Sequence, residues 1–218
     1  MHESSFNMMG TLIRRYRPFI GGKVADVGAM DVNGTYKELV TPWANYFGID
    51  TAAGPNVDIV AAPYEVPGGP YDAILCGQVL EHVEDMPRLV CSIADAMRPD
   101  GICLLVAPNT CGEHRYPVDC WRVFPDGMDW LLRTAKLEHV AVFINGMDTW
   151  GVGKKPGQRT LERDDHAPFG TNSSVSSEPV RGTVASVPRN VGGKFARRGR
   201  GVVLLRGRRI GRARMRSR

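Results

Sequence analysis

Short apolar runs alternate with segments of helical spacing through the first 150 residues, and this alternation limits the fold more than any other feature. The apolar runs are typical of strands, which we expect at residues 23–27, 45–49, 57–60, 71–76, 102–107 and 137–143. The segments of helical spacing lie before and between them, at residues 8–16, 34–40, 86–97 and 126–134. Strands that alternate with helices predict an α/β fold, namely a Rossmann-like, doubly wound, mostly parallel sheet with helices on both faces.

Charge divides the chain into two parts. Residues 1–150 carry 11 Lys and Arg against 19 Asp and Glu, a net charge of −8, whereas residues 151–218 carry 17 against 4, a net charge of +13. The second part is rich in Gly, Ser, Thr and Pro, and no acidic residue follows position 188. Such a composition buries too little apolar surface to offset the entropy of ordering. We therefore expect a folded domain at 1–156 and a low-complexity, Arg-rich, disordered tail at 157–218.

Several classes of protein are excluded by the sequence. It has no run of about 18 apolar residues, so no membrane span is expected. The first ten residues lack the basic and apolar regions of a signal peptide. The five cysteines have no CxxC spacing, which favours reduced thiols in a cytoplasmic protein over disulfides or a zinc site. No metal site is predicted.

A first candidate site follows the expected strand 23–27. In a doubly wound sheet, ligands bind beyond the carboxyl ends of the strands. Here Asp26 and Val27 precede Gly28, Ala29 and Met30. The glycine would let a ligand approach the backbone, but Met30 replaces the second glycine of a GxGxxG turn, and Asp26 would repel a phosphate. The pattern favours a cofactor with an ammonium group, the alternative being a tight turn with an incidental Asp.

A second candidate is Asp50, at the end of the next expected strand. It lies 22 residues after Gly28, near the spacing at which an acid reaches the ribose hydroxyls of an adenosine ligand. A carboxylate can accept hydrogen bonds from both hydroxyls. The alternative is an Asp at the end of a strand that caps the next turn. Two further elements follow, the segment 77–83 (GQVLEHV) after the strand 71–76 and an expected turn at 97–101 (MRPDG).

In this order, the four elements resemble the class I methyltransferases that use S-adenosylmethionine, over roughly residues 10–156. The resemblance extends to a subgroup of small bacterial and phage methyltransferases. That subgroup shares the segments 31–34 (DVNG) and 77–83, and a block at 114–122 (HRYPVDCWR) followed by 125–128 (PDGM). We refer to residues 114–122 as the HRYPVDCWR block.

The resemblance implies S-adenosylmethionine as the cofactor. The turn formed by Asp26, Val27, Gly28, Ala29 and Met30 would hold the methionine end, with Asp26 near the ammonium group. Of the other residues that the resemblance implies, Asp50 would bind the ribose hydroxyls, Thr51 and Ala52 would lie beside the adenine, and Gln78 would border the sulfonium and its methyl group. Many relatives have an Asp near positions 61–62, where this chain has two alanines. Adenine recognition by backbone groups and apolar contact is therefore expected.

The resemblance also implies in-line transfer of the methyl group to a nucleophile. A general base is needed only where the acceptor is a hydroxyl of high pKa. Candidate catalytic bases are His114 and Asp119, whereas His82 is interpreted as a helix-cap or supporting residue. The HRYPVDCWR block could equally form a structural lid or bind substrate. Its Arg115 and Arg122 could pair with Asp119 or bind an anionic substrate.

The motifs that the chain lacks limit the classes of methyl acceptor that we expect. The segment after the strand 71–76 contains neither the Asn/Asp-Pro-Pro-Tyr of amino-methylating DNA enzymes nor the Pro-Cys of cytosine C5 enzymes. We expect a small-molecule or glycan acceptor that is methylated at a hydroxyl. The alternative function is a nucleic-acid-binding protein whose basic tail binds nucleic acid or another anion nonspecifically. The methyltransferase-like domain would then be an inactive or accessory platform.

Overall fold

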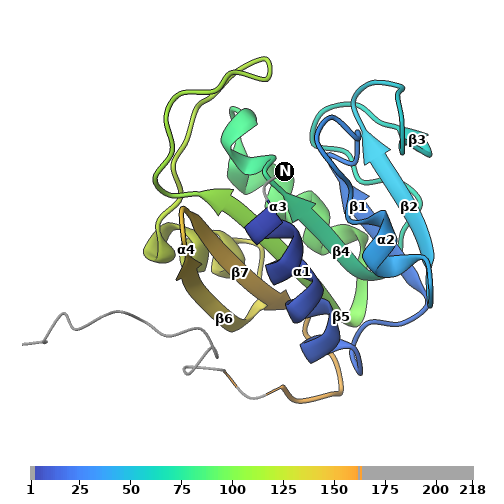
Figure 1. The fold of residues 1–218 in the computed structure, drawn as a ribbon. Coiled ribbons are helices and arrows are strands. Elements are labelled where there is room, and N and C mark those ends of the chain that lie inside the picture. Colours follow the sequence, from blue (N-terminus) through green and yellow to red (C-terminus); the bar gives the residue numbers. More distant parts are fainter. Residues whose placement is uncertain (1–2, 162, 164–218) are drawn as a thin grey trace, which may run out of the picture. The chain divides into compact units, whose positions relative to one another are not determined.

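One seven-stranded sheet organises the protein in a computed structural model, which describes residues 3–161 and 163 (Figure 1). The strands are β1 (Lys23–Val27), β2 (Asn45–Asp50), β3 (Ile59–Val60), β4 (Tyr71–Gly77), β5 (Met97–Pro108), β6 (Glu138–Asn145) and β7 (Asp148–Lys154). Their order in the sheet is β3-β2-β1-β4-β5-β7-β6. The first five are mutually parallel, and β7 runs antiparallel to both β5 and β6. The prediction of a Rossmann-like, mostly parallel α/β sheet is confirmed.

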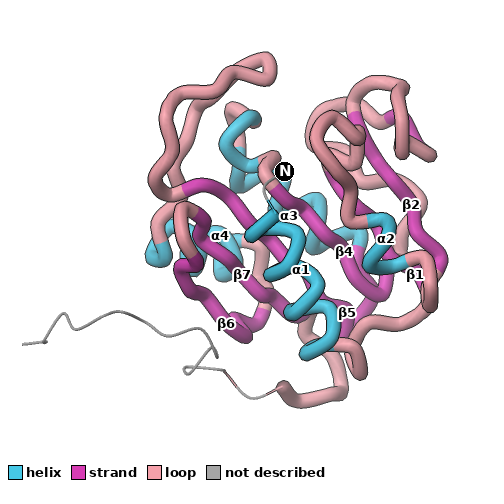
Figure 2. Tube along the Cα trace, viewed as in Figure 1, coloured by secondary structure: helices cyan, strands magenta, loops and turns pink. Residues whose placement is uncertain are grey.

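Helices cover both faces of this sheet, as Figure 2 shows. They are α1 (Glu3–Tyr16), α2 (Lys37–Val40), α3 (Met86–Ala96) and α4 (Pro125–Thr134), with a short 3-10 turn, η1 (Leu80–His82), before α3. The start of α3 is fixed by Asp85, whose side chain accepts a hydrogen bond from Arg88 N at 3.1 Å, and by a proline in its first turn. The capped start of α3 follows η1, which lies between β4 and this helix in the chain.

The core consists of two layers, one on each face of the sheet. Along β5, Ile102, Leu104 and Val106 pack with residues of α1 and α2. The alternate positions Cys103 and Leu105 pack with residues of α3 and α4. Because both faces of the strand are covered, its sequence is continuously apolar instead of alternating. The central strands are thereby held rigidly, and the loops at their carboxyl ends are held with them.

Strand β7 was not expected, because the sequence loses its apolar periodicity after Trp150. The structure gives the reason. A Cβ atom at position 151 would lie 2.6 Å from Met128 Cγ, and one at position 153 would lie 2.8 Å from a methyl carbon of Leu132. Both neighbours belong to α4. The glycines therefore allow α4 to lie directly on β7, which is fully buried. Because glycine has no side chain, the apolar pattern that would predict a strand is missing at these positions.

The turn expected at residues 97–101 is instead part of β5. The strand bulges there, between the pairs Tyr71–Met97 and Ala73–Ile102. Asp100, with a φ of 65°, lies in the bulge. The strand therefore starts earlier than its apolar run indicates.

The described chain ends in contact with the bulge in β5. Asp100 accepts hydrogen bonds from the backbone nitrogens of Gln158 and Arg159, each at 2.9 Å, and Leu161 packs against the core on the α1 face. The domain boundary at residue 156 stays a prediction. The predicted tail lies outside the described residues from position 164 onward. No helix in the described part of the chain has the length and apolar character needed to cross a membrane.

Candidate functional site

The predicted cofactor residues meet at one edge of the sheet. Val27, at the end of β1, pairs with Ile49 of β2 on one side and with Cys76 of β4 on the other. The chain continues from β1 to β2 on the first side and returns to β4 on the second, which is the topological switch point of the sheet. The predicted residues that lie at or just beyond these strand ends are Asp26, Val27, Gly28, Ala29, Met30, Asp50, Thr51 and Gln78.

Gly28 is where two of these loops come closest. Its φ is 78°, and a Cβ atom there would lie 2.2 Å from Val79 Cγ2, in the loop after β4. The nitrogens of Gly28 and Ala29 both donate to the carbonyl oxygen of Ile49, at 2.9 and 3.1 Å. Only glycine combines this backbone conformation with this contact. The turn after β1 is therefore held tightly between β2 and the loop after β4.

Asp26 is a buried acid at the end of β1, with 3% of its surface exposed. Its Oδ2 accepts a hydrogen bond of 2.8 Å from the hydroxyl of Tyr46, which in turn accepts one from the amide of Asn56 at 2.7 Å. Burial raises the pKa of Asp26 to about 7, although the Tyr46 bond lowers it, and the charge of Asp50 raises it further. A cation at this carboxyl would favour its ionised form.

Asp50 connects the turns after β1 and β2. Its Oδ2 accepts from Met30 N at 3.0 Å, and its Oδ1 accepts from Thr51 N at 2.7 Å. The residue therefore caps the turn that follows its strand, as the structural interpretation expected. Oδ1 also accepts longer bonds from Thr51 Oγ1 and Ala52 N, each at 3.4 Å, so the capacity left for ligand hydroxyls is mainly on Oδ2.

Gln78 follows β4 in a left-handed conformation, with a φ of 58°. Its backbone nitrogen donates to Val106 O at 3.0 Å, and its side-chain amide donates to Asp148 Oδ1 at 3.0 Å. A positive φ is uncommon outside glycine and persists where the surroundings enforce it. Here the neighbouring strand β5 and the hairpin of β6 and β7 hold the residue in place.

The HRYPVDCWR block is bound to the loop after β4 by three hydrogen bonds of 2.7 Å to three successive residues. Cys120 N donates to Glu81 O, the ring nitrogen Nδ1 of His82 is bonded to Val118 O, and the indole of Trp121 donates to Val83 O. These bonds join residues 81–83 and the HRYPVDCWR block into one wall beside the switch point.

Asp119 is paired with Arg122 in this wall. The guanidinium donates to both carboxylate oxygens, at 2.6 and 2.8 Å, and His114 N donates to Oδ2 at 2.7 Å. These bonds hold the pKa of Asp119 well below its usual range. Arg115 instead pairs with Glu113, at 2.6 Å. The sequence suggested the same two roles for Arg115 and Arg122, but only Arg122 is bonded to Asp119. Arg122 therefore stabilises the HRYPVDCWR block.

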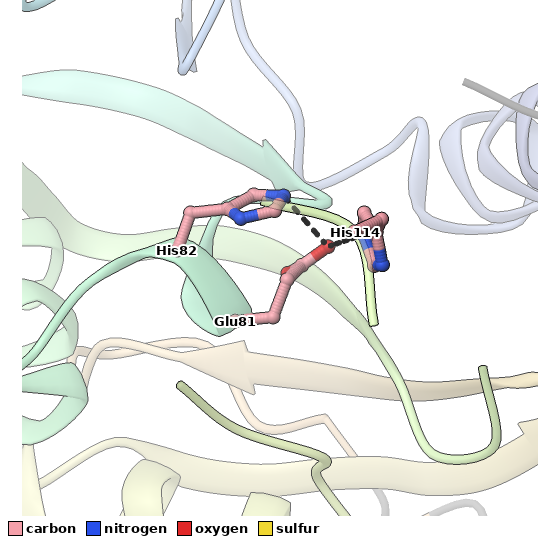
Figure 3. A group of neighbouring side chains, drawn as sticks. All are labelled: Glu81, His82 and His114. Atoms are coloured by element: carbon pink, nitrogen blue, oxygen red, sulfur yellow. Dashed lines mark ion pairs between the residues drawn. The ribbon is translucent and has the colours of Figure 1, made fainter. Parts of the chain in front are cut away.

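Sequence reasoning did not single out Glu81, which lies between two histidines (Figure 3). Its side chain is fully buried, and neither carboxylate oxygen has a hydrogen-bond partner among the described residues. The nearest groups are His82 Nε2 at 3.7 Å and His114 Nε2 at 3.8 Å, both measured to Glu81 Oε1. Burial raises the pKa of Glu81 to about 7. The adjacent Glu81 and His82, with His114 in the loop after the next strand, could have indicated this cluster.

Comparison with known proteins agrees with this architecture. The sequence model of a family described as a methyltransferase domain matches residues 15–144. A search of the curated proteins found no match. The specific bacterial and phage subgroup, and the meaning of the HRYPVDCWR block within it, stay predictions.

Several solved methyltransferases have a similar structure. The magnesium protoporphyrin IX methyltransferase of Synechocystis PCC 6803, with bound S-adenosylhomocysteine, is 14% identical, with a TM-score of 0.54 over 71% of this chain and 83% of that one. The Burkholderia thailandensis 1,6-didemethyltoxoflavin-N1-methyltransferase, with 1,6-didemethyltoxoflavin and S-adenosylhomocysteine bound, is 15% identical, with a TM-score of 0.57 over 71% and 79%. An S-adenosylmethionine-dependent methyltransferase of Clostridium acetobutylicum is 7% identical, with a TM-score of 0.56 over 72% and 93%. These identities show a shared fold. Because the family model spans more than half of the sequence, the chain belongs to the methyltransferase-domain family.

Proposed function

We propose that this protein binds S-adenosylmethionine and transfers its methyl group to a hydroxyl of a small-molecule or glycan acceptor. The observation that carries the proposal is the pair of acids, Asp26 and Asp50, on either side of the Gly28 turn at the switch point of the sheet. Membership of the methyltransferase-domain family supports it, as do structural neighbours that bind S-adenosylhomocysteine.

The cofactor fits the charges at this edge. The ammonium group of the methionine moiety would lie at Asp26 and would compensate the charge of a buried carboxylate that accepts a hydrogen bond from the Tyr46 hydroxyl. The ribose hydroxyls would donate to Asp50, with Thr51 and Ala52 beside the adenine. Two acids so close to the turn disfavour a cofactor with a phosphate at this position, because the charges would repel.

The reaction would be an in-line displacement. The bond between sulfur and the methyl carbon breaks and its electron pair stays on sulfur, while a new bond forms between that carbon and the acceptor oxygen, whose proton passes to water. Most of the catalysis by the protein would come from alignment and the exclusion of water, which can contribute several kcal/mol, about the scale of well-oriented intramolecular reactions. Gln78, held by Val106 and Asp148, would border the reacting groups.

The wall formed by the HRYPVDCWR block would face the acceptor. Asp119 is a weak candidate for a base, because Arg122 and His114 N occupy its oxygens and its pKa is low. We assign it the role of positioning the loop. The imidazole of His114, which is 43% exposed, is the group of this loop that we place on the acceptor side. Tyr116 and Trp121 are exposed on the same loop and offer apolar surface to an organic acceptor.

Calorimetry with S-adenosylmethionine tests the proposal. We expect the natural protein to bind, and Asp50→Ala to bind about 100-fold more weakly, since two charge-assisted hydrogen bonds of roughly 1.5 kcal/mol each are lost. Asp126→Ala, at an exposed position in the first turn of α4, is the matched control. Thermal melting establishes that each variant is folded. No measurable binding by the natural protein would refute the cofactor, and equal binding by Asp50→Ala would refute the ribose contact.

A further inference from the structure

We propose that Glu81, His82 and His114 bind one divalent transition-metal ion on the acceptor side of the site. The sequence predicted no metal. The three groups come from two segments that follow neighbouring strands, β4 and β5, and they lie together (Figure 3).

The donor atoms have the spacing of a metal site. One ligand atom from each residue lies within 4.8 Å of the others. Glu81 Oε1 is 3.7 Å from His82 Nε2 and 3.8 Å from His114 Nε2. Metal–ligand bonds of about 2.0–2.2 Å place two donors roughly 3.0–3.5 Å apart. Each Glu81–histidine distance would therefore shorten by a few tenths of an ångström, and the distance between the two histidine ligand atoms, at most 4.8 Å, by about 1 Å.

Both imidazoles are oriented to coordinate through Nε2. His82 Nδ1 is 2.7 Å from Val118 O, and His114 Nδ1 is 3.1 Å from Gly112 O. A carbonyl oxygen only accepts, so each Nδ1 carries the hydrogen, and the lone pair of a neutral ring is on Nε2. A histidine that binds a metal typically donates its second nitrogen to a carbonyl in this way. The two rings lie edge to face with their centroids 5.0 Å apart, and Figure 3 shows one Glu81 oxygen paired with both.

Among the described residues, no lysine or arginine side chain pairs with Glu81. Glu81 is fully buried and its carboxylate has no hydrogen-bond partner among the described residues, while two nitrogen lone pairs face it. Three acceptors that converge without a donor are unfavourable unless a cation lies between them. A proton can join two of the three atoms, whereas a metal ion can bind all of them. Arg122, the nearby cation, has its guanidinium bonded to Asp119.

The donor set and its exposure indicate the kind of ion. Two imidazole nitrogens and one carboxylate oxygen suit Mn²⁺, Fe²⁺, Co²⁺, Ni²⁺ or Zn²⁺, whereas Mg²⁺ and Ca²⁺ prefer oxygen ligands alone. His82 is 14% exposed and His114 is 43% exposed, so the cluster is open to solvent on the His114 side. Three protein ligands leave coordination positions for an oxygen atom of another molecule.

An acceptor with a coordinating hydroxyl would complete the site, and this second step rests on the proposed function. A hydroxyl bound to a divalent ion has a lowered pKa, so that its proton passes to water more readily. His114 would then act on the acceptor through the ion. The substrate class is an alcohol or phenol whose hydroxyl is free to bind a metal.

Metal titration of the full chain, without a purification tag and after treatment with a chelator, tests the inference. We expect one equivalent of Co²⁺ to bind and to produce visible absorption, and one equivalent of Mn²⁺ or Zn²⁺ to compete with it. Glu81→Gln and His114→Ala should each weaken Co²⁺ binding at least about 100-fold, as expected when one of three ligands is lost. His139→Ala is the control, because His139 is paired with Asp129 away from the cluster.

The outcomes separate the two proposals. His114 is exposed, so His114→Ala should stay folded, and it should bind S-adenosylhomocysteine as the natural protein does. The inference is overturned if the natural protein binds none of the three ions, or if His114→Ala binds Co²⁺ equally well. Metal binding without cofactor binding would overturn only the proposed function. Cofactor binding without metal binding would overturn only the inference.

Discussion

Replacement of Asp26 by asparagine should weaken cofactor binding while it stabilises the fold at alkaline pH. Asparagine keeps the shape of the side chain, and its carbonyl oxygen can still accept the bond from Tyr46. It removes a carboxyl whose burial raises the pKa from the usual 3.8 to about 7. The ionised form is therefore disfavoured in the folded protein, by on the order of 4 kcal/mol at roughly 1.4 kcal/mol per pH unit.

The sign follows from the protons bound in each state. Between pH 5 and pH 8 the unfolded chain has already lost the Asp26 proton, whereas the folded protein loses it only near pH 7. The folded state holds more protons over this interval, so the free energy of unfolding falls as the pH rises, by about 3 kcal/mol from this group alone. The asparagine variant has no such group to titrate, so its free energy of unfolding lacks this decrease. The difference in unfolding free energy between the variant and the natural protein should therefore shift by about 3 kcal/mol in favour of the variant from pH 5 to pH 8.

Urea unfolding of both proteins at pH 5, 6.5 and 8 measures this difference directly. Asp126→Asn, at an exposed position on α4, controls for general effects of removing a negative charge. At pH 8, calorimetry should show that Asp26→Asn binds S-adenosylmethionine far more weakly, because the ammonium group loses its counter-charge. If the difference in unfolding free energy between Asp26→Asn and the natural protein stays constant with pH, the reasoning about the buried carboxyl is refuted.

Two further perturbations test the packing of the site. Gly28→Ala should lower the free energy of unfolding by at least about 2 kcal/mol, because its φ is 78° and the new methyl would lie 2.2 Å from Val79 Cγ2. Gly22→Ala meets nothing within 4 Å and should have little effect in the same urea titration, so equal losses would contradict the close contact. In a thiol-labelling assay at pH 8, exposed Cys120 should react first and Cys76 only after denaturation, because burial raises the pKa of the Cys76 thiol. Fast labelling of native Cys76 would contradict the burial of β4.

The sequence predicts β1 and β4 well, because each is a short, mostly apolar run bounded by glycine or proline. The expected strand 23–27 coincides with β1, and the expected strand 71–76 differs from β4 by one residue. Helix α2 is shorter than the expected 34–40, since Gly34 N is bonded to the side chain of Asp31 and the helix begins only at Lys37. β7 could not be predicted from apolar spacing, because contact with α4 requires glycine where a strand would otherwise show side chains.

The candidate site is predicted in part for a similar reason. The order of the elements brings Asp26, Gly28, Asp50 and Gln78 to one edge, and that order can be inferred from the alternation of strands and helices. The environment of Glu81 cannot be inferred in this way. Its burial, without a hydrogen-bond donor in the described part of the chain, depends on the path of the loop after β5, whose bonds to residues 81–83 form between segments distant in the sequence. The local sequence pattern does not indicate contacts between segments that are distant in the chain.

The reversed direction of β7 has a consequence for how substrate choice could diversify. Because the strand runs against β5, the tip of its hairpin with β6 returns to the ligand edge, where Asp148 lies opposite Pro108 and receives the amide of Gln78, 70 residues away in the chain. On the proposed function, the hairpin tip shapes the acceptor side, while Asp26 and Asp50 serve the cofactor from other loops. Because Asp148 holds Gln78, which would border the methyl group, a change of the hairpin tip would act on the acceptor side and on the reacting groups together. Only a hairpin tip that keeps Asp148 would reshape the acceptor side and leave the position of Gln78 unchanged.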